Sequence, residues 1–208
     1  PTPVVSGNTI YLATQTAGGD ATNRISMEPF PEALAHYDTN GDGLIEMSEL
    51  PAGSPVLVRF FRIDLDQDGK LGPIEWTKHA RVFQQAQNVA IAVRAGGEGN
   101  VTKSHVKWIQ RRGLPTVPSP LVYHGIVYMV KKEGIVTTLD TKTGTQLKQG
   151  RIPGRGNYYA SIVAGDGKVY LASERGVVSV LDAGRQWEVR GSHDFGERIM
   201  ATPTIADG

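Results

Sequence analysis

Residues 38–49 read DTNGDGLIEMSE, and residues 64–75 read DLDQDGKLGPIE. In both stretches a short oxygen-bearing side chain stands at the first, third and fifth positions, glycine at the sixth and glutamate at the twelfth. A calcium ion in a protein binds about six to eight oxygen atoms, and alternating oxygen donors around a sharp glycine turn can surround it. Each stretch therefore predicts a calcium-binding loop.

The spacing is that of the EF-hand loop, and it assigns a ligand to each position. In the first loop the predicted ligands are Asp38, Asn40, Asp42, the carbonyl of Leu44, Glu46 directly or through water, and Glu49. In the second loop they are Asp64, Asp66, Asp68, the carbonyl of Lys70, and Glu75, with water at Gly72. We therefore predict two calcium ions. The alternative, a pair of solvated acidic turns, is weakened by the second complete match.

Apolar residues around the loops recur at helical spacing. Residues 30–37 before the first loop, 57–61 before the second and 76–90 after it each show this pattern and predict helices. Ile45 and Leu71, each just after the seventh loop position, would let the loops pair back to back. The segment is therefore predicted to be a paired EF-hand domain.

The composition gives no sign of a nucleic-acid or membrane partner. The 208 residues carry a formal net charge of +1 and contain no cysteine. Acidic residues outnumber basic ones between positions 20 and 90, whereas basic residues predominate elsewhere. No apolar run is long enough to span a bilayer, and the N-terminus lacks the regions of a signal peptide. We expect no direct membrane insertion and no disulfide framework.

Outside the acidic segment, one β-rich phrase repeats. It reads PVVSGNTIYLA at 3–13, PLVYHGIVYMV at 120–130 and SIVAGDGKVYLA at 161–172, and it begins again as PTIADG at 203–208. Each full copy has two β-rich runs around a glycine turn, and a third run ending in Leu-Asp follows two of them. A period of about 40 residues with four short strands is typical of propeller blades.

The first interval between copies is longer by about the length of the acidic segment, which we interpret as an insertion within the first blade. The sequence thus predicts a mainly β fold. Residues 1–17 and 91–208 would form a partial β-propeller of about three four-stranded blades, and residues 18–90 an inserted α-helical EF-hand pair. Propellers close with about four to eight blades, so we expect the remaining propeller blades as partners.

The repeats resemble those of the quinoprotein-type, or PQQ-like, β-propellers, whose repeat ends in the pattern AxDxxTGxxxW. Residues 139–148, LDTKTGTQLK, follow it but have Lys148 in place of tryptophan, and residues 182–187, DAGRQW, reach the glycine two residues early. With residues 100–108 and 113–120, the chain also resembles planctomycete-type bacterial proteins that carry an EF-hand pair within the propeller. The resemblance implies a periplasmic or extracellular location.

We expect a non-catalytic binding or scaffold protein whose insert is ordered by calcium, with an unknown protein or small molecule as partner. One alternative is a PQQ-dependent oxidoreductase. The resemblance implies that many alcohol-oxidising members place a vicinal disulfide beside the quinone, and a chain without cysteine cannot form one. The other alternative is a calcium sensor that exposes an apolar surface to a partner.

Several other side chains are weaker candidates. Trp108 and Trp187 are predicted to pack between blades, with ligand stacking as the alternative. Residues 157–159, NYY, precede a predicted inner strand and form a candidate small-molecule site. The histidines have no partner at metal-ligand spacing, so we expect surface or packed roles for His36, His79, His105, His124 and His193.

Overall fold

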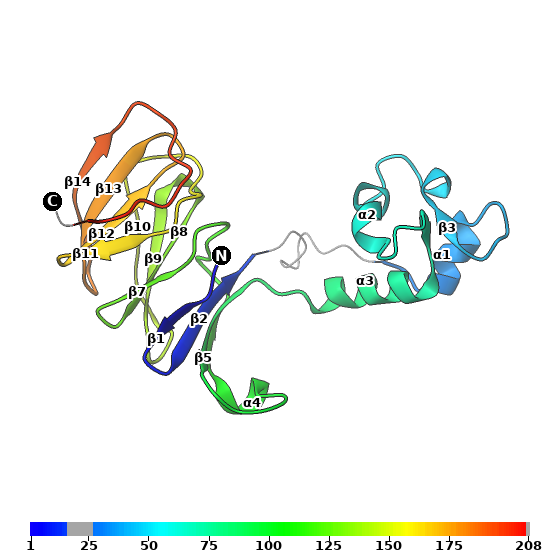
Figure 1. Cartoon of the computed structure of the whole chain (residues 1–208), viewed down its shortest axis with the longest axis horizontal. Coiled ribbons are helices and arrows are strands. Elements are labelled where there is room, and N and C mark those ends of the chain that lie inside the picture. Colours follow the sequence, from blue (N-terminus) through cyan, green and yellow to red (C-terminus); the bar gives the residue numbers. More distant parts are fainter. Residues whose placement is uncertain (16–26, 207–208) are drawn as a thin grey trace. The chain divides into compact units, whose positions relative to one another are not determined.

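The computed structural model describes residues 1–15 and 27–206. The chain forms two compact units, one comprising Pro1–Gln15 with Asn88–Gly208 and the other Thr16–Gln87 (Figure 1). The second unit ends before the predicted boundary at residue 90, because Val89 and Ala90 already pair with Thr14 and Ala13 in a sheet. Within the described residues, no helix has both the length and the apolar character needed to cross a bilayer.

The first unit contains three four-stranded antiparallel sheets, each with its strands in the same up-and-down order. The first sheet consists of β1 (Val4–Ser6), β2 (Thr9–Thr14), β5 (Val89–Arg94) and β6 (Val106–Gln110). The second consists of β7 (Leu121–Tyr123), β8 (Ile126–Lys131), β9 (Ile135–Asp140) and β10 (Gln146–Arg151). The third consists of β11 (Val163–Gly165), β12 (Lys168–Ala172), β13 (Val177–Asp182) and β14 (Glu188–Asp194).

The register of the first sheet confirms the predicted insertion. β2 and β5 are neighbours in the sheet although the whole helical segment separates them in sequence, and they pair from Thr9 with Arg94 to Thr14 with Val89. A short helix, α4 (Thr102–His105), precedes β6, and a 3₁₀ turn, η4 (Lys132–Gly134), links β8 to β9. The predicted fold class is therefore confirmed: mainly β, with three four-stranded blades and a helical insert.

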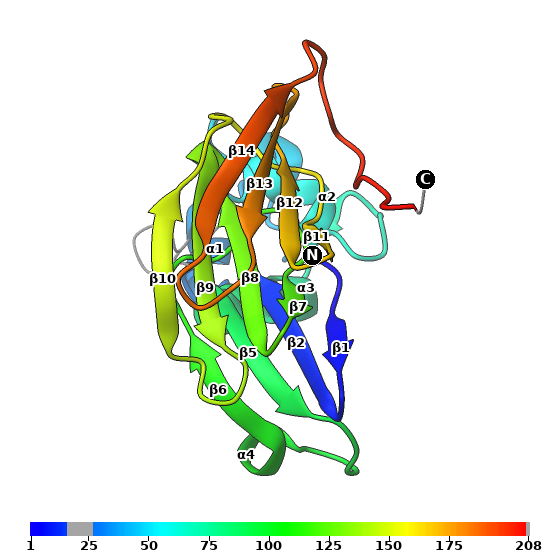
Figure 2. The ribbon, with the colours of Figure 1, turned by 90° about the vertical axis from the view of Figure 1, so that its left-hand side faces the viewer.

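The three sheets stack face to face, with the third nearest the viewer in Figure 2. Between the first two sheets, Tyr11 and Trp108 pack against Val127, Met129 and Leu139. Between the second and third sheets, the buried cluster comprises Ile126, Tyr128, Val130, Val136, Ile152, Tyr158, Ile162, Val169, Leu171, Leu181 and Trp187. Successive side chains of a strand point to opposite faces, so β8, which is apolar from Ile126 to Val130, buries side chains toward both neighbouring sheets. The prediction that both tryptophans pack between blades is confirmed.

The second unit has its own core. Its helices are α1 (Phe30–Tyr37), α2 (Phe60–Ile63) and α3 (Pro73–Gln85). The 3₁₀ turn η2 (Met47–Glu49) ends the first loop, and η3 (Leu57–Arg59) lies between the loops. At its centre Trp76 is 1% exposed, donates its indole N–H to the carbonyl of Glu28 at 2.8 Å and meets Phe30 edge to face. The predicted helix over 76–90 was too long at its C-terminal end, because the chain leaves the helix at Ala86, with ψ 130°, to enter β5.

Candidate metal centre

Each predicted calcium loop begins where a helix ends. Asp38 is the C-terminal cap of α1 and donates its N–H to the carbonyl of Leu34 at 3.0 Å. Asp64 caps α2 in the same way, through the carbonyl of Phe60 at 2.9 Å. Both caps have extended backbone, so the chain leaves the helix at the first predicted ligand. The helices therefore position the first carboxylate of each loop.

The middle of each loop turns on a glycine and then enters a strand. Gly43 and Gly69 have φ of +82° and +84°, a conformation that side chains with a Cβ adopt only at a steric cost. The strands β3 (Ile45–Glu46) and β4 (Lys70–Leu71) then pair antiparallel. Ile45 lies opposite Leu71, and both are fully buried. The expected back-to-back pairing of the loops is confirmed.

In the first loop, side-chain oxygens accept backbone N–H groups and hold the turn closed. Asp38 accepts the amide of Gly41 through Oδ1 at 2.7 Å and that of Gly43 through Oδ2 at 3.0 Å. Asn40 Oδ1 accepts the amide of Asp42 at 2.8 Å, and Asp42 Oδ1 accepts that of Leu44 at 2.9 Å. These bonds place the three predicted side-chain ligands on the inner side of a closed turn.

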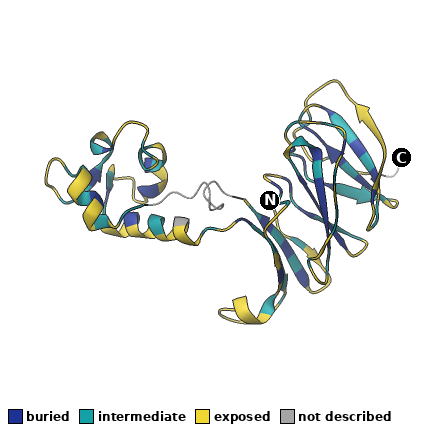
Figure 3. Ribbon diagram, turned by 180° about the vertical axis from the view of Figure 1, so that it is seen from behind, coloured by how far each residue is buried: buried dark blue, intermediate teal, exposed yellow. Residues whose placement is uncertain are grey.

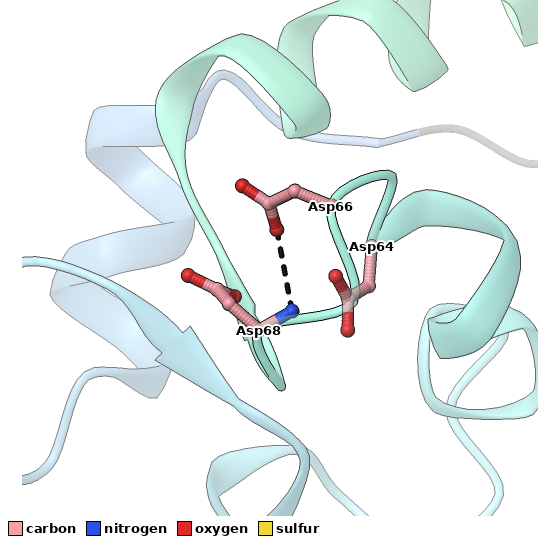
Figure 4. A group of neighbouring side chains, drawn as sticks. All are labelled: Asp64, Asp66 and Asp68. Carbon is pink, nitrogen blue, oxygen red and sulfur yellow. Dashed lines mark hydrogen bonds between the residues drawn. The ribbon is translucent and has the colours of Figure 1, made fainter.

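The second loop brings three carboxylates together. Asp64, Asp66 and Asp68 have oxygen atoms within 4.8 Å of one another (Figure 4). Asp66 Oδ1 accepts the amide of Asp68 at 3.3 Å, and Asp68 Oδ1 accepts that of Lys70 at 2.8 Å. Three like charges at this separation repel one another, so the arrangement calls for a cation.

Asp64 gives the clearest sign of what the second loop holds. The residue is only 5% exposed, and its Oδ2 accepts the amide of Gly69 at 3.1 Å. Its Oδ1 is buried and has no hydrogen-bond partner among residues 1–15 and 27–206. A buried carboxylate oxygen with no partner is destabilising by about 1–3 kcal/mol or more, and a metal ion is the ligand that its charge and hardness suit.

The closing glutamates lie across the loops. Glu49 accepts the amides of Thr39 and Glu46 at 2.9 and 2.8 Å, and the amide of Glu46, followed by that of Thr39, holds the pKa of Glu49 below its ordinary value. Glu75 accepts the amides of Leu65 and Gly72 at 2.6 and 3.1 Å. Glu49 Oε1 also accepts the hydroxyl of Thr39 at 3.0 Å and the amide of Asn40 at 3.2 Å, so its roughly four lone-pair sites are filled and some of these bonds must break before Glu49 binds an ion. Glu75, with its two bonds, keeps acceptor capacity for an ion. Both glutamates therefore lie across their loops at the twelfth position, where the EF-hand spacing predicts the closing ligand.

One feature of the pair was missed by the sequence analysis, which assigned only the carbonyl of Lys70. The side chain of Lys70 crosses to the first loop, where Nζ lies 2.6 Å from Asp42 Oδ2 and 2.9 Å from Glu46 Oε1. The bond from Lys70, followed by that from the amide of Leu44, keeps the pKa of Asp42 below its ordinary value, and the pKa of Lys70 is raised in turn. The signal available in the sequence was the opposite charge of Glu46 and Lys70 across the β3–β4 pair.

The residues outside the insert are arranged differently. The candidate site at residues 157–159 lies beside a pocket of about 220 Å³ whose lining includes Asn157, Tyr158 and Tyr159. The Tyr158 hydroxyl donates there to the carbonyl oxygens of Pro153 and Gly154, which lie at 3.1 and 2.6 Å. Within the described residues, the carboxylates at 64, 66 and 68 form the one group of metal-binding side chains brought together, and no histidine belongs to it.

The first loop also matches a known family. The EF hand family model matches residues 33–51, which contain the whole first loop. This match and the carboxylate cluster of the second loop indicate calcium binding by the insert. The second loop lies outside the matched residues, so two calcium ions and the individual ligands stay predictions.

Two solved structures are similar to part of the chain. No curated protein matches the sequence. The crystal structure of BamB from Moraxella catarrhalis is similar with a TM-score of 0.43 and 19% identity, over 59% of this chain and 39% of BamB. A europium-containing methanol dehydrogenase is similar with a TM-score of 0.35 and 15% identity, over 53% of this chain and 20% of the dehydrogenase. The chain therefore spans less than half the length of either protein.

Proposed function

We propose that this chain is a calcium-binding β-propeller module with a non-catalytic binding or scaffold role, in which two calcium ions order the helical insert. The observation that carries the proposal is the buried, unpartnered oxygen of Asp64 within the cluster of three aspartates. The predicted ligands would hold each ion through carboxylate and carbonyl oxygens, and the ion would neutralise the crowded charge. To order the insert in this way, the two ions need only bind to the loops, and the insert need not catalyse a reaction.

Removal of calcium tests the ordering role. An ion that binds only the folded insert stabilises it by about 2.7 kcal/mol at a hundredfold excess over Kd. The far-ultraviolet circular dichroism of the full chain should lose helical signal in a chelator and regain it with calcium. Magnesium at equal concentration serves as the control, because it demands a tighter octahedral geometry. Identical spectra and thermal midpoints with calcium and with chelator would contradict the proposal.

A calcium sensor is the second candidate, and exposed apolar side chains on the insert favour it. Val58, Phe61 and Ile74 are 77%, 82% and 80% exposed. Ile74 and Leu65 line an open depression of about 440 Å³ beside the second loop. A dye that reports apolar surface should brighten on calcium addition if the insert is a sensor. Unchanged fluorescence, together with calcium-dependent helix content, would favour the ordering role.

We also propose that the outward face of the third sheet packs against a further blade of the same repeat. Tyr128 faces the third sheet, and its hydroxyl accepts the amide of Gly184 at 2.9 Å. Tyr170 occupies the same place in the repeat as Tyr128, on the face opposite the buried Val169 and Leu171.

The outward position of Tyr170 suggests the same role toward a fourth blade. Its cross-strand partner, Val180, is likewise only partly buried, and Figure 3 shows β14 exposed along its length. Sedimentation velocity of the 208-residue chain and of Tyr170→Lys tests this proposal. The open face should cause association that the lysine reduces, whereas two strictly monomeric proteins would contradict it.

We also propose a periplasmic or extracellular location, and quinone binding as the alternative function. The resemblance of the repeats to PQQ-like propellers supports both a quinone-binding alternative and a periplasmic or extracellular location. Addition of the quinone with calcium should produce a bound-cofactor absorbance if the alternative holds. Fractionation of cells that make the native protein tests the location, which a purely cytoplasmic signal would contradict.

A further inference from the structure

The two loops differ in how their fifth-position aspartates are engaged. Asp42 uses Oδ1 to accept the amide of Leu44 at 2.9 Å, which leaves Oδ2 for an ion in the first loop. That oxygen is the one held by the ammonium of Lys70 at 2.6 Å. The same ammonium lies 2.9 Å from Oε1 of Glu46, the ninth-position residue. A cation of the protein thus occupies two predicted calcium ligands.

The second loop has no counterpart of this arrangement. Asp68 uses Oδ1 to accept the amide of Lys70 at 2.8 Å, as Asp42 does with Leu44. The seventh position, which Lys70 occupies in the second loop, is Leu44 in the first loop. Leu44 is apolar and lies against Gly72, so it offers Asp68 no charge. Among the described residues no ion pair joins Asp68.

The register of the loop pair explains why the lysine reaches its partners. Lys70 lies directly opposite Glu46 in the β3–β4 pair. Side chains directly opposite each other in an antiparallel pair are close enough to interact, and opposite charges there attract. Asp42 precedes β3 on the same loop, so one ammonium can bridge both carboxylates. The contact is built into the pairing of the loops.

We propose that Lys70 is an internal competitor for calcium in the first loop, so that the second loop binds calcium more tightly and fills first. This inference rests on the proposed function, in which both loops bind calcium. The ammonium must leave Asp42 before an ion takes that oxygen, whereas the second loop presents its three carboxylates free of a lysine. Lys70 therefore sets the difference in affinity between two loops of nearly equal ligand sets.

The test reads each loop separately. Glu75→Gln disables the second loop and reports on the first, and Glu49→Gln does the reverse. With Glu75→Gln in place, Lys70→Met should tighten calcium binding to the first loop by about three- to tenfold, because it removes two ion contacts between side chains that are only about one-third exposed. In the second background the change should be smaller. Lys70→Arg, which keeps the charge, should leave the parent affinity nearly unchanged.

Lys78→Met is the matched control, because it removes a positive charge from an exposed position of α3 that lies outside both loops. Equal tightening by Lys78→Met and Lys70→Met, or no tightening by Lys70→Met, would overturn the proposal. Calorimetry distinguishes a failure of the proposed function from a failure of the proposed role of Lys70. If neither background binds calcium, the proposed function fails. If both bind and Lys70→Met changes nothing, only the role of Lys70 fails.

Discussion

One oxygen of Asp64 accepts the backbone N–H of Gly69 at 3.1 Å, while the other is buried with no partner in the described part of the chain. In the absence of an ion, this carboxylate is a source of instability, because its buried oxygen has no compensating hydrogen bond and the carboxylates of Asp66 and Asp68 lie close to it. The same residue should therefore destabilise the calcium-free insert and stabilise the calcium-bound one.

Asp64→Asn tests whether Asp64 has opposite effects on the stability of the calcium-free and the calcium-bound insert. Without calcium, the variant should unfold at a higher temperature than the parent, because it removes a buried charge. With calcium, the rise in melting temperature should be strongly reduced. The control is Asp66→Asn, at an exposed position of the same cluster. That variant should also weaken the calcium response, but with little change in the calcium-free protein. A calcium-free Asp64→Asn protein less stable than the parent would contradict the account.

Packing between blades depends on Trp108. Its indole N–H donates to the carbonyl of Thr141 in the next sheet at 2.9 Å, and its ring lies where a Cβ on Gly144 would come within 2.6 Å. Trp108→Ala should lower the free energy of unfolding of the first unit by about 3–5 kcal/mol. Trp108→Phe keeps much of the packing but loses the hydrogen bond, so its loss should be smaller.

Denaturant unfolding followed by the β-sheet dichroism measures both Trp108 losses. Ile109→Ala is the matched control, since Ile109 is the next residue of β6 and 51% exposed. Its effect should stay well below that of Trp108→Ala. Equal losses at the two positions would show that Trp108 does not carry the interblade contact.

Asp140 predicts an acid dependence of the first unit. The amide of Lys142, followed by the guanidinium of Arg185 and the amide of Thr143, holds the pKa of Asp140 below its ordinary value. Because the folded-state pKa is the lower one, the stabilisation is present above the ordinary aspartate pKa of about 3.9. It should be lost as the pH falls from there through the folded-state pKa.

Asp140→Asn keeps an acceptor for the turn amides but removes the titrating charge. The variant should therefore lose part of the parent's drop in stability at acid pH, measured as the unfolding midpoint at pH 3 and pH 6. The Arg185 side chain is 66% exposed, so its ion pair with Asp140 contributes about 1 kcal/mol at most. A parent and a variant with identical acid dependence would contradict the assignment.

The local patterns predicted most of the fold, because they depend on near neighbours. Gly43 and Gly69 mark turns that the backbone needs, and the repeated β-rich phrases at 120–130 and 161–172 become the paired strands β7–β8 and β11–β12. Residue 90 was placed in a helix because its apolar spacing matched one. It lies instead in β5, where Ala90 and Ala92 bury the same face against the second sheet. The helical spacing of apolar residues could not predict this packing, because the contact is with a sheet that is distant in sequence.

The departures from the repeat pattern needed the structure. Lys148 stands where the PQQ-like pattern has tryptophan, and the structure places its ammonium 4.6 Å from the ring centre of Trp187. It also donates to the carbonyl of Trp187 at 2.5 Å. A cation over an indole ring is attracted to its face, so the third blade supplies the aromatic ring that the second lacks. Local sequence patterns could not predict this contact, because Lys148 and Trp187 are far apart in the sequence.

The most direct measurement is calorimetric titration of calcium into the calcium-free full chain, with Glu49→Gln and Glu75→Gln beside it. The account predicts two binding events in the parent and one in each variant, because each glutamate closes one loop. It predicts none in the double variant. A parent that binds no calcium, or single variants that both bind two ions as tightly as the parent, would contradict the central claim.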